Sequence, residues 1–518
     1  MFEVKTRDLG ARIGKLVTRH GVIETPFLFP VVDPKRQVPS LTRIKDTGFN
    51  GIITNAYLFY KRNEGIAKPI HSELMWDGII MTDSGGYQVL VYGDIDVDNK
   101  TIVTYEKEIG SDIAVILDVP TGSKMSFEEA YKAVSETYRR GIEALPLIMD
   151  SDQLWVYPVQ GAPFKDLLVR SAVLANKLPY DIYAIGSPTV MLEKYRYSKL
   201  VELVAITRAL LPPNKPLHVF GVGHPMIIPF LVAAGGDLFD SASYVLYARD
   251  SRYMVETGTK NIKDLSYFPC NCPACSKYTP REVLEMTASQ REEFIAIHNL
   301  YMLVREIRVV KEAIREGRLW ELLEYRSRAH PTLFEAFNIV KGYAKLFERA
   351  APASSPSYKA LLIYDDRSFF HPRLKINVRR ALSLVSESAT NKLVILIPAY
   401  KKPYTSQSEY MNIKALFGLR DDVLICFIHP ALGVFKPEVS FTYPFYQHEF
   451  RITKASISTA RIARFVEKIW RAGPRGILIV RAAWFKGDVE HKVWKLLIER
   501  GVHVTICRLD EISSLLPP

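Results

Sequence analysis

The first half of the chain alternates short apolar runs with longer segments in which apolar residues recur three and four positions apart. The short runs are typical of buried strands, and the longer segments are typical of amphipathic helices. Eight runs qualify as strands: 27–32, 51–55, 78–81, 113–117, 154–159, 182–185, 217–221 and 238–239. Helical segments between them include 126–145, 164–178, 200–211 and 225–234. Eight such repeats predict an α/β fold in which a parallel sheet closes into a (β/α)₈ TIM barrel.

The second half of the chain has a different order of elements. Residues 281–348 are typical of a run of helices, and residues 350–358 are small, polar and proline-containing, as in a linker. Strand-like runs then alternate with helices again, at 360–364, 393–398, 423–428, 477–480 and 502–507. We therefore expect a barrel domain with a helical end over residues 1–349, a linker over 350–358 and a smaller C-terminal α/β domain over 359–518.

Polar residues follow several of the eight predicted strands. In a TIM barrel the carboxyl ends of the strands form the mouth that carries the chemistry, so these side chains should converge there. A single Asp at such a position is most often a helix cap, but a cap does not explain the whole set. The set comprises Asp83, Ser84, Asp118, Gln160, Gly186, Ser187 and Asp240.

Three of the five cysteines crowd into one short segment. Cys270, Cys272 and Cys275 can face one ion from a tight turn, and His298 follows on a predicted helix. Three Cys and one His complete a tetrahedral zinc site with no position left for a water nucleophile, so we expect one structural zinc ion per chain, within an insertion over 265–300. The alternatives are that the cysteines are free core thiols and that His298 is an ordinary surface or core histidine.

Two carboxylates stand in segments suited to chemistry at a sugar. Asp83 and Ser84 precede two glycines and Tyr87, so a flat ligand could approach the backbone closely there. Asp240 lies in the segment Gly235–Tyr244. Two carboxylates on opposite sides of a glycosidic bond are the minimal equipment for a nucleophile and a proton shuttle at an anomeric carbon.

These motifs resemble those of the tRNA-guanine transglycosylases. The segments Thr82–Gln88, Leu238-Phe239-Asp240 and the cysteine cluster occur in the order and separation of that family. The resemblance covers about residues 1–349. The stretches 91–97, 109–118 and 328–331 favour its archaeal branch.

The resemblance implies a role for each residue at the predicted mouth. Asp240 would be the nucleophile that attacks C1′ of the target ribose, and Asp83 would move the protons. Asp118 and Gln160 would bind the polar edge of the base, Gly186 and Ser187 would lie at the pocket backbone, and Ser84 and Tyr87 would contact the substrate, with the Tyr87 ring stacked on the base. A carboxylate suits guanine because it accepts two N–H bonds from one edge of the base.

The implied function is the exchange of guanine 15 in the D-loop of tRNA for 7-cyano-7-deazaguanine, in archaeosine biosynthesis. Gly86 and the pair Ser187-Pro188 depart from the usual archaeal sequence and bear on which base enters. Two alternatives remain: a non-catalytic tRNA-binding subunit, and an archaeosine synthase-like paralogue acting on the nitrile already in tRNA. Family members commonly dimerise, so a homodimer is expected.

The charge of the chain agrees with an RNA partner. The formal net charge is +12, with 68 Lys and Arg residues, although a merely basic enzyme would have the same balance. On the predicted helix 456–472, one face carries Arg461, Arg464, Lys468 and Arg471, which are candidate phosphate contacts or simply a solvated face. No PUA-type RNA-binding domain is recognisable, so we expect it to be absent or supplied by a second protein.

No apolar run of membrane-spanning length occurs, and the N-terminal residues lack the apolar core of a signal peptide. We therefore expect a cytoplasmic protein without a membrane partner.

Overall fold

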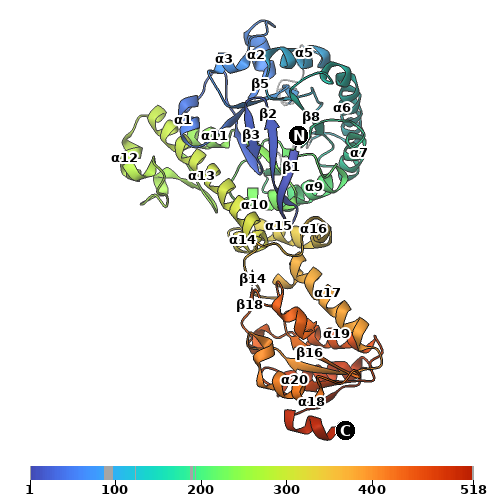
Figure 1. The fold of residues 1–518 in the computed structure, drawn as a ribbon. Helices are drawn as coiled ribbons and strands as arrows, with labels where there is room; N and C mark the ends of the chain where they lie inside the picture. Colours follow the sequence, from blue (N-terminus) through green and yellow to red (C-terminus); the bar gives the residue numbers. More distant parts are fainter. Residues whose placement is uncertain (1, 87–96, 123, 187–190, 193, 516–518) are drawn as a thin grey trace. The chain divides into compact units, whose positions relative to one another are not determined.

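The structure of the 518-residue chain is a computed structural model that describes residues 2–86, 97–122, 124–186, 191–192 and 194–515 (Figure 1). Contacts divide the chain into two compact units, Met1–Ala350 and Ala351–Pro518. That residues 350–358 act as a linker stays a prediction.

The first unit is built on eight parallel strands that follow one another around a barrel. Their order in the sheet is β4-β11-β10-β9-β8-β7-β6-β5. A parallel bridge between Val31 and Ile53 brings the two ends of this order together, and the Val32 N–H donates to the Ile53 carbonyl at 2.7 Å. The predicted (β/α)₈ barrel is therefore confirmed. The strands are β4 (Phe27–Pro30), β5 (Gly51–Asn55), β6 (Ile79–Asp83), β7 (Ile113–Val115), β8 (Leu154–Val159), β9 (Ile182–Ile185), β10 (Leu217–Val219) and β11 (Leu238–Ser241).

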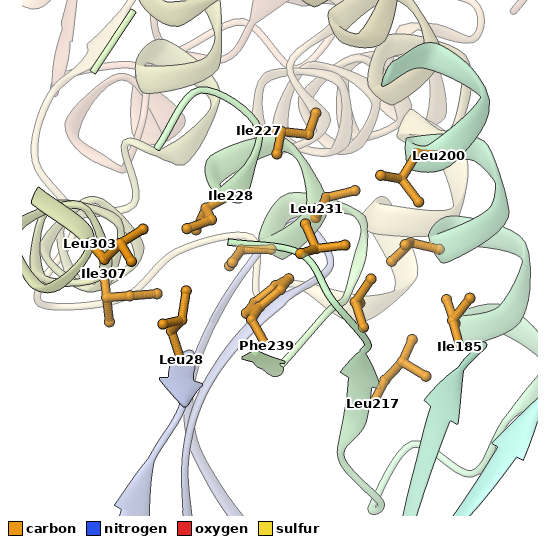
Figure 2. Packing of buried hydrophobic residues seen from close by; sticks show 14 of the residues in the cluster. Leu28, Ile185, Leu200, Leu217, Ile227, Ile228, Leu231, Phe239, Leu303 and Ile307 are labelled. Carbon is orange, nitrogen blue, oxygen red and sulfur yellow. The ribbon is translucent and has the colours of Figure 1, made fainter. Parts of the chain in front are cut away.

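Helices surround the barrel, as Figure 1 shows. Alternate residues of each strand face them, because successive side chains of a strand point to opposite sides. Figure 2 shows Leu28, Leu217 and Phe239 from three strands packed with residues of helices such as Leu231 and Leu303. The helices are α1 (Leu41–Asp46), α2 (Ala56–Arg62), α3 (Ile70–Leu74), α5 (Asn99–Ile109), α6 (Phe127–Ile148), α7 (Lys165–Ala175), α9 (Tyr197–Leu210), α10 (Ile228–Ala234) and α11 (Ser243–Arg249).

An antiparallel sheet that the apolar pattern did not predict closes the amino-terminal end of the barrel. It comprises β1 (Phe2–Asp8), β2 (Ala11–Thr18) and β3 (Gly21–Glu24). Its Leu16 and Ile23 pack with residues at the starts of barrel strands, including Ile79 and Ile113. The polar outer face of this sheet interrupts the apolar pattern, which is why the sequence does not reveal it.

A hairpin and a series of helices follow the barrel. The hairpin is β12 (Arg252–Val255) with β13 (Gly258–Asn261), and the short 3-10 helices η1 (Ile262–Asp264) and η2 (Cys275–Lys277) come next. The expected run of helices is present as α12 (Pro280–Glu285), α13 (Ala288–Glu316), α14 (Leu319–Arg326), α15 (Pro331–Gly342) and α16 (Ala344–Ala350).

The second unit is an α/β domain with its own hydrophobic core. Its main sheet has the order β17-β16-β15-β19-β20, in which only β17 runs antiparallel to its neighbour. A short parallel pair, β14 (Leu361–Leu362) and β18 (His448–Glu449), lies apart from it in the sheet order. The strands of the main sheet are β15 (Leu393–Pro398), β16 (Val423–His429), β17 (Gly433–Phe435), β19 (Gly476–Val480) and β20 (Thr505–Cys507). The helices are α17 (Pro372–Ala389), α18 (Ser408–Phe417), α19 (Thr459–Trp470), α20 (Asp488–Glu499) and α21 (Ile512–Leu515).

Within the described residues, no helix combines the length and apolar character needed to cross a membrane.

Candidate active site and metal centre

The barrel strands bring several of the predicted site residues to one end of the barrel. Asp83 is the last residue of β6 and shares the interior side of that strand with Met81, two positions earlier. By the same alternation, Asp240 shares the interior side of β11 with Leu238. Gln160 lies just after the end of β8. These positions are at the carboxyl ends of parallel strands, where TIM barrels carry their active sites.

Asp83 has an environment that favours its protonated form. Burial raises the pKa of its carboxyl group most, and the negative charges of Asp118 and Asp240 raise it further, to about 7. The Asn55 amide donates to Asp83 Oδ2 at 3.4 Å. Both other carboxylates are thus near enough for their charges to act on Asp83. A carboxyl group that is half protonated near neutral pH can serve as both a proton donor and a proton acceptor.

Asp118 and Gln160 form a buried pair. The Gln160 side-chain amide donates to Asp118 Oδ2, and its carbonyl oxygen accepts from the Thr121 N–H at 3.0 Å. Burial raises the pKa of Asp118, and the hydrogen bond from Gln160 opposes this effect, with a net value of about 6. The Asp118 carboxylate is thus held in place and is ionised at neutral pH.

Two glycines leave the space that this pair occupies. A Cβ on Gly86 would lie 2.1 Å from Asp118 Oδ1, and a Cβ on Gly186 would lie 2.0 Å from Gln160 Nε2. A side chain at either position would therefore force Asp118 or Gln160 to move. Gly86, which departs from the usual archaeal sequence, therefore leaves room for the side chain of Asp118.

Asp240 is held by a contact that the sequence did not reveal. Its side chain is almost fully buried, and Oδ1 lies 2.7 Å from His218 Nε2 and 2.9 Å from the Gly221 N–H. His218 is fully buried on β10, opposite Leu238 in the register of the sheet. One feature of the sequence could have revealed this contact. His218 is the single ionisable residue within the apolar run 217–221, and strand alternation turns it toward the barrel interior.

Of the remaining predicted pocket residues Ser84, Tyr87 and Ser187, the structure describes only Ser84. Ser84 is fully buried, and its hydroxyl donates to the Ile116 carbonyl at 3.1 Å, so it braces the backbone beside Asp118. Tyr87 and Ser187 lie outside the described residues.

The three clustered cysteines and His298 meet at one point. Their ligand atoms all lie within 4.8 Å of one another. His298 Nδ1 is 3.3 Å from the Cys275 sulfur and 3.7 Å from the Cys272 sulfur. Ligands at ordinary zinc–sulfur and zinc–nitrogen distances in a tetrahedron lie about 3.5 Å apart, so the four residues fit such an ion.

Neighbouring groups prepare His298 to act as a ligand. Its Nε2 lies 2.8 Å from the Met254 carbonyl, which fixes Nε2 as the protonated nitrogen and leaves the Nδ1 lone pair facing the cysteines. The ring of Tyr253 stacks on the imidazole at 3.5 Å between centroids, and its hydroxyl lies 3.2 Å from the Cys275 sulfur. Both residues belong to β12, which sequence reasoning did not connect with the cluster. The cluster can therefore hold a metal ion.

The basic helix in the second unit is present as α19. Its apolar face is buried, as expected from the pattern, and Arg464, Lys468 and Arg471 are exposed. Arg461 differs from them. Its guanidinium group lies 4.2 Å from the centre of the Phe369 ring and donates to the Ala431 carbonyl at 3.0 Å. Burial lowers the pKa of Arg461 to about 10, so its side chain faces the domain interior rather than a solvated face.

Comparison with known proteins gives one consistent result. The family model for queuine tRNA-ribosyltransferase matches residues 8–332. A protein of Aeropyrum pernix named tRNA-guanine(15) transglycosylase is 43% identical over 456 residues, which cover 87% of this chain and 88% of that protein. The protein of the same name from Sulfolobus acidocaldarius is 41% identical, over 87% of this chain and 89% of its own length.

A longer relative of the same name, from Methanocaldococcus jannaschii, is 39% identical over 86% of this chain and 68% of its own length. The resemblance drawn from the motifs is confirmed by these matches. Because the family model covers most of the barrel unit and the relatives match along most of both units, the chain belongs to the queuine tRNA-ribosyltransferase family, the tRNA-guanine transglycosylases.

Proposed function

We propose that this protein replaces guanine 15 in the D-loop of tRNA by 7-cyano-7-deazaguanine, as a step of archaeosine biosynthesis. The names of the similar proteins support the tRNA position and the type of reaction. The observation that carries the proposal is the position of Asp83 and Asp240 at the carboxyl ends of barrel strands. There, burial and the charges of Asp118 and Asp240 raise the pKa of Asp83 to about 7.

The reaction begins with the release of guanine. Asp240 attacks C1′ of the ribose, the bond from C1′ to N9 of guanine breaks, and the electron pair of that bond leaves with the base. Asp83, in its protonated form, gives its proton to the departing guanine. The tRNA is then held as a glycosyl ester of Asp240.

The second half of the reaction reverses the roles of the two residues. N9–H of the incoming base loses its proton to Asp83, N9 attacks C1′, and the bond from C1′ to Asp240 breaks with return of the electron pair to the carboxylate. Asp83 ends the cycle protonated and Asp240 ionised, so no external acid or base is consumed. The target nucleotide must be turned out of the folded RNA to reach the barrel.

The pair of Asp118 and Gln160 recognises the base. The ionised Asp118 accepts the two N–H bonds of the guanine edge, and the Gln160 amide keeps the carboxylate in place. Gly186 supplies backbone beside Gln160, and its lack of a side chain leaves room for the Gln160 amide. In this proposal Ser84 supports the pocket through Ile116. The roles of Tyr87 and Ser187 in substrate contact rest on the family resemblance.

The cysteine cluster holds one structural zinc ion per chain. Cys270, Cys272, Cys275 and His298 use all four positions of a tetrahedral ion, so it supplies folding energy and no open site for chemistry. The region around the cluster also contributes to the expected homodimer.

The tRNA contacts extend to the second unit. Arg464 and Lys468 on α19 and Arg471 at its C-terminal cap are exposed and suited to phosphates, whereas Arg461 acts mainly in packing. A separate PUA-domain protein is a further proposed partner, and a cytoplasmic location accords with a tRNA substrate.

Base exchange tests the proposed activity. Purified protein incubated with tRNA should incorporate labelled guanine without any nitrogen donor. Competition among guanine, 7-cyano-7-deazaguanine and the 7-aminomethyl base should favour the 7-cyano base. A protein that left labelled guanine in solution but modified tRNA already carrying the nitrile would instead be a synthase-like paralogue.

Asp240→Ala should abolish exchange while tRNA binding survives, because only the covalent step needs that carboxylate. Wild type trapped with tRNA should give a slowly migrating band on a denaturing gel, and the variant should give none. An adduct that persisted in Asp240→Ala would rule out this residue as the nucleophile.

A further inference from the structure

We propose that His218 is a positioning residue, which together with the Gly221 N–H holds Asp240 so that Oδ2 is the atom that attacks the ribose; this rests on the proposed function. Both donors meet the same oxygen, Oδ1, at 2.7 and 2.9 Å. Among the residues that the structure describes, none donates a hydrogen bond to Oδ2. One oxygen is therefore anchored, and the other is available for bond formation.

The surroundings of His218 select one form of its ring. An ionised carboxylate only accepts hydrogen bonds, so Nε2 carries the proton. Nδ1 is buried and has no partner in the described part of the chain. The rings of Phe29 and Phe220 pack near it, with centroids 6.2 and 4.6 Å away. Nε2 is therefore the ring nitrogen that donates to Asp240.

This arrangement has a consequence for each half of the reaction. When Oδ2 bonds to C1′, the C1′–N9 pair leaves with guanine, which takes the Asp83 proton, and Oδ1 becomes the ester carbonyl oxygen. When the ester is displaced by the incoming base, the bond pair returns to the carboxylate and negative charge returns to Oδ1. The donors from His218 and Gly221 are already directed at the atom where this charge develops.

Two substitutions separate a donor from a packing residue. His218→Phe keeps a buried ring but removes the donor, whereas His218→Gln keeps an N–H close to the place of Nε2. Loss of a donor at the atom where charge develops should slow displacement of the ester by the incoming base roughly 10- to 100-fold in His218→Phe. The KM values for tRNA and base should stay within about twofold of wild type, because the base pocket is untouched. His218→Gln should recover most of the rate.

His71→Phe is the matched control. His71 lies on α3, at the amino-terminal end of the barrel, where it contacts Asp112. This variant should lower the melting temperature yet keep the wild-type kcat. If His218→Phe does not fold, His218→Met, which also lacks a donor, replaces it.

The outcomes distinguish the two levels of the proposal. A donor-free variant with a kcat within about twofold of wild type would overturn the role of His218, even with Asp240→Ala inactive. The same conclusion follows if the Gln variant is as slow as the Phe variant. An active Asp240→Ala, in contrast, would overturn the proposed nucleophile itself.

Discussion

At the residue scale, the environment gives similar carboxyl groups different roles. Asp83 and Asp118 both lie in the barrel mouth and both have raised pKa values, chiefly because they are buried. The Gln160 amide stabilises the ionised form of Asp118, whereas the negative charges of two neighbours destabilise that of Asp83. In the proposed function, Asp118 is therefore the acceptor for the base and Asp83 the carrier of the proton.

These pKa values predict a bell-shaped pH dependence of adduct formation. The proposed reaction needs Asp118 ionised and Asp83 protonated. It should therefore fall below about pH 6, where Asp118 takes up a proton, and above about pH 7, where Asp83 loses one. Single-turnover adduct formation across a pH series measures both limbs, whose midpoints belong to the interacting set of carboxyl groups.

Asp118→Asn provides the control for this prediction. It removes a negative charge that helps to retain the Asp83 proton, so the alkaline limb of the residual activity should move to lower pH. An alkaline limb in the same place as in wild type would contradict the proposed origin of the raised Asp83 pKa.

At the element scale, clusters of side chains join segments that are distant in sequence. The β2–β3 turn, α3 and the start of β7 meet where His20 and His71 contact the fully buried Asp112. The two imidazole rings stack at 3.8 Å and each faces a different carboxylate oxygen, which suits hydrogen bonding better than shared coordination of an ion. Backbone N–H groups of His20 and Ile80 complete the contacts of the carboxylate.

Asp112 should contribute pH-dependent stability. Burial alone would raise its pKa, but the hydrogen bonds from His71, the Ile80 N–H and His20 outweigh burial and lower it to about 2 from an ordinary 3.8. Asp112→Asn should therefore reduce the free energy of unfolding at pH 7 by about 2 kcal/mol. The difference should shrink as the pH falls from 3.8 towards 2, because wild type then loses the same interaction. Urea unfolding across this range measures it.

Asp77→Asn is a suitable comparison for Asp112→Asn. Asp77 is exposed and pairs with Lys45 at 2.6 Å, and such surface pairs contribute little to stability. Equal effects of the two substitutions would show that the buried contacts of Asp112 are not the source of the stability.

The cysteine cluster joins the segment after β13 to the long helix α13. We expect Cys272→Ser to lose its metal and to unfold at a lower temperature, since ligand binding is coupled to folding in such sites. Elemental analysis should find one zinc ion per wild-type chain and less in the variant. Catalysis should decline only as the fold does. A metal-free variant with full thermal stability would contradict a structural role.

At the scale of the whole molecule, the basic charge is distributed over two units with separate cores. The barrel carries the proposed reacting groups, and the second unit offers exposed cations on α19 and at its C-terminal cap. Since Arg461 is occupied with Phe369 and Ala431, the face available for phosphates consists of Arg464, Lys468 and Arg471.

Removing these three charges should weaken tRNA binding and reduce its salt dependence. Each phosphate contact contributes roughly 0.7 to 0.9 to the slope of log affinity against log salt, so the triple alanine variant should lower the slope by about 2. A control variant with Lys414, Lys492 and Lys495 changed to alanine removes the same charge from α18 and α20. If the slope changed equally in both variants, or in neither, the proposed tRNA contact through α19 would be contradicted.

The sequence by itself determined the barrel and the chemical character of its mouth. Strand alternation and the 3.6-residue helical period are local properties, so eight strand-helix repeats could be counted directly, and the polar residues at strand ends could be assigned to one mouth. The spacing of Cys270, Cys272 and Cys275 likewise indicated a metal cluster, because close ligands in a chain need little tertiary information.

Only the tertiary structure decided which groups act on each other. Three contacts depend on register and packing between distant segments. They are the contact of His218 with Asp240, the contact of His71 with Asp112 and the packing of Arg461 against Phe369. The amino-terminal sheet was hidden for the same reason, since its strands bury Leu16 and Ile23 against the ends of other strands rather than along a continuous apolar run. Side-chain types and their periods are set locally, whereas hydrogen-bond partners and shifted pKa values arise from neighbours that folding brings together.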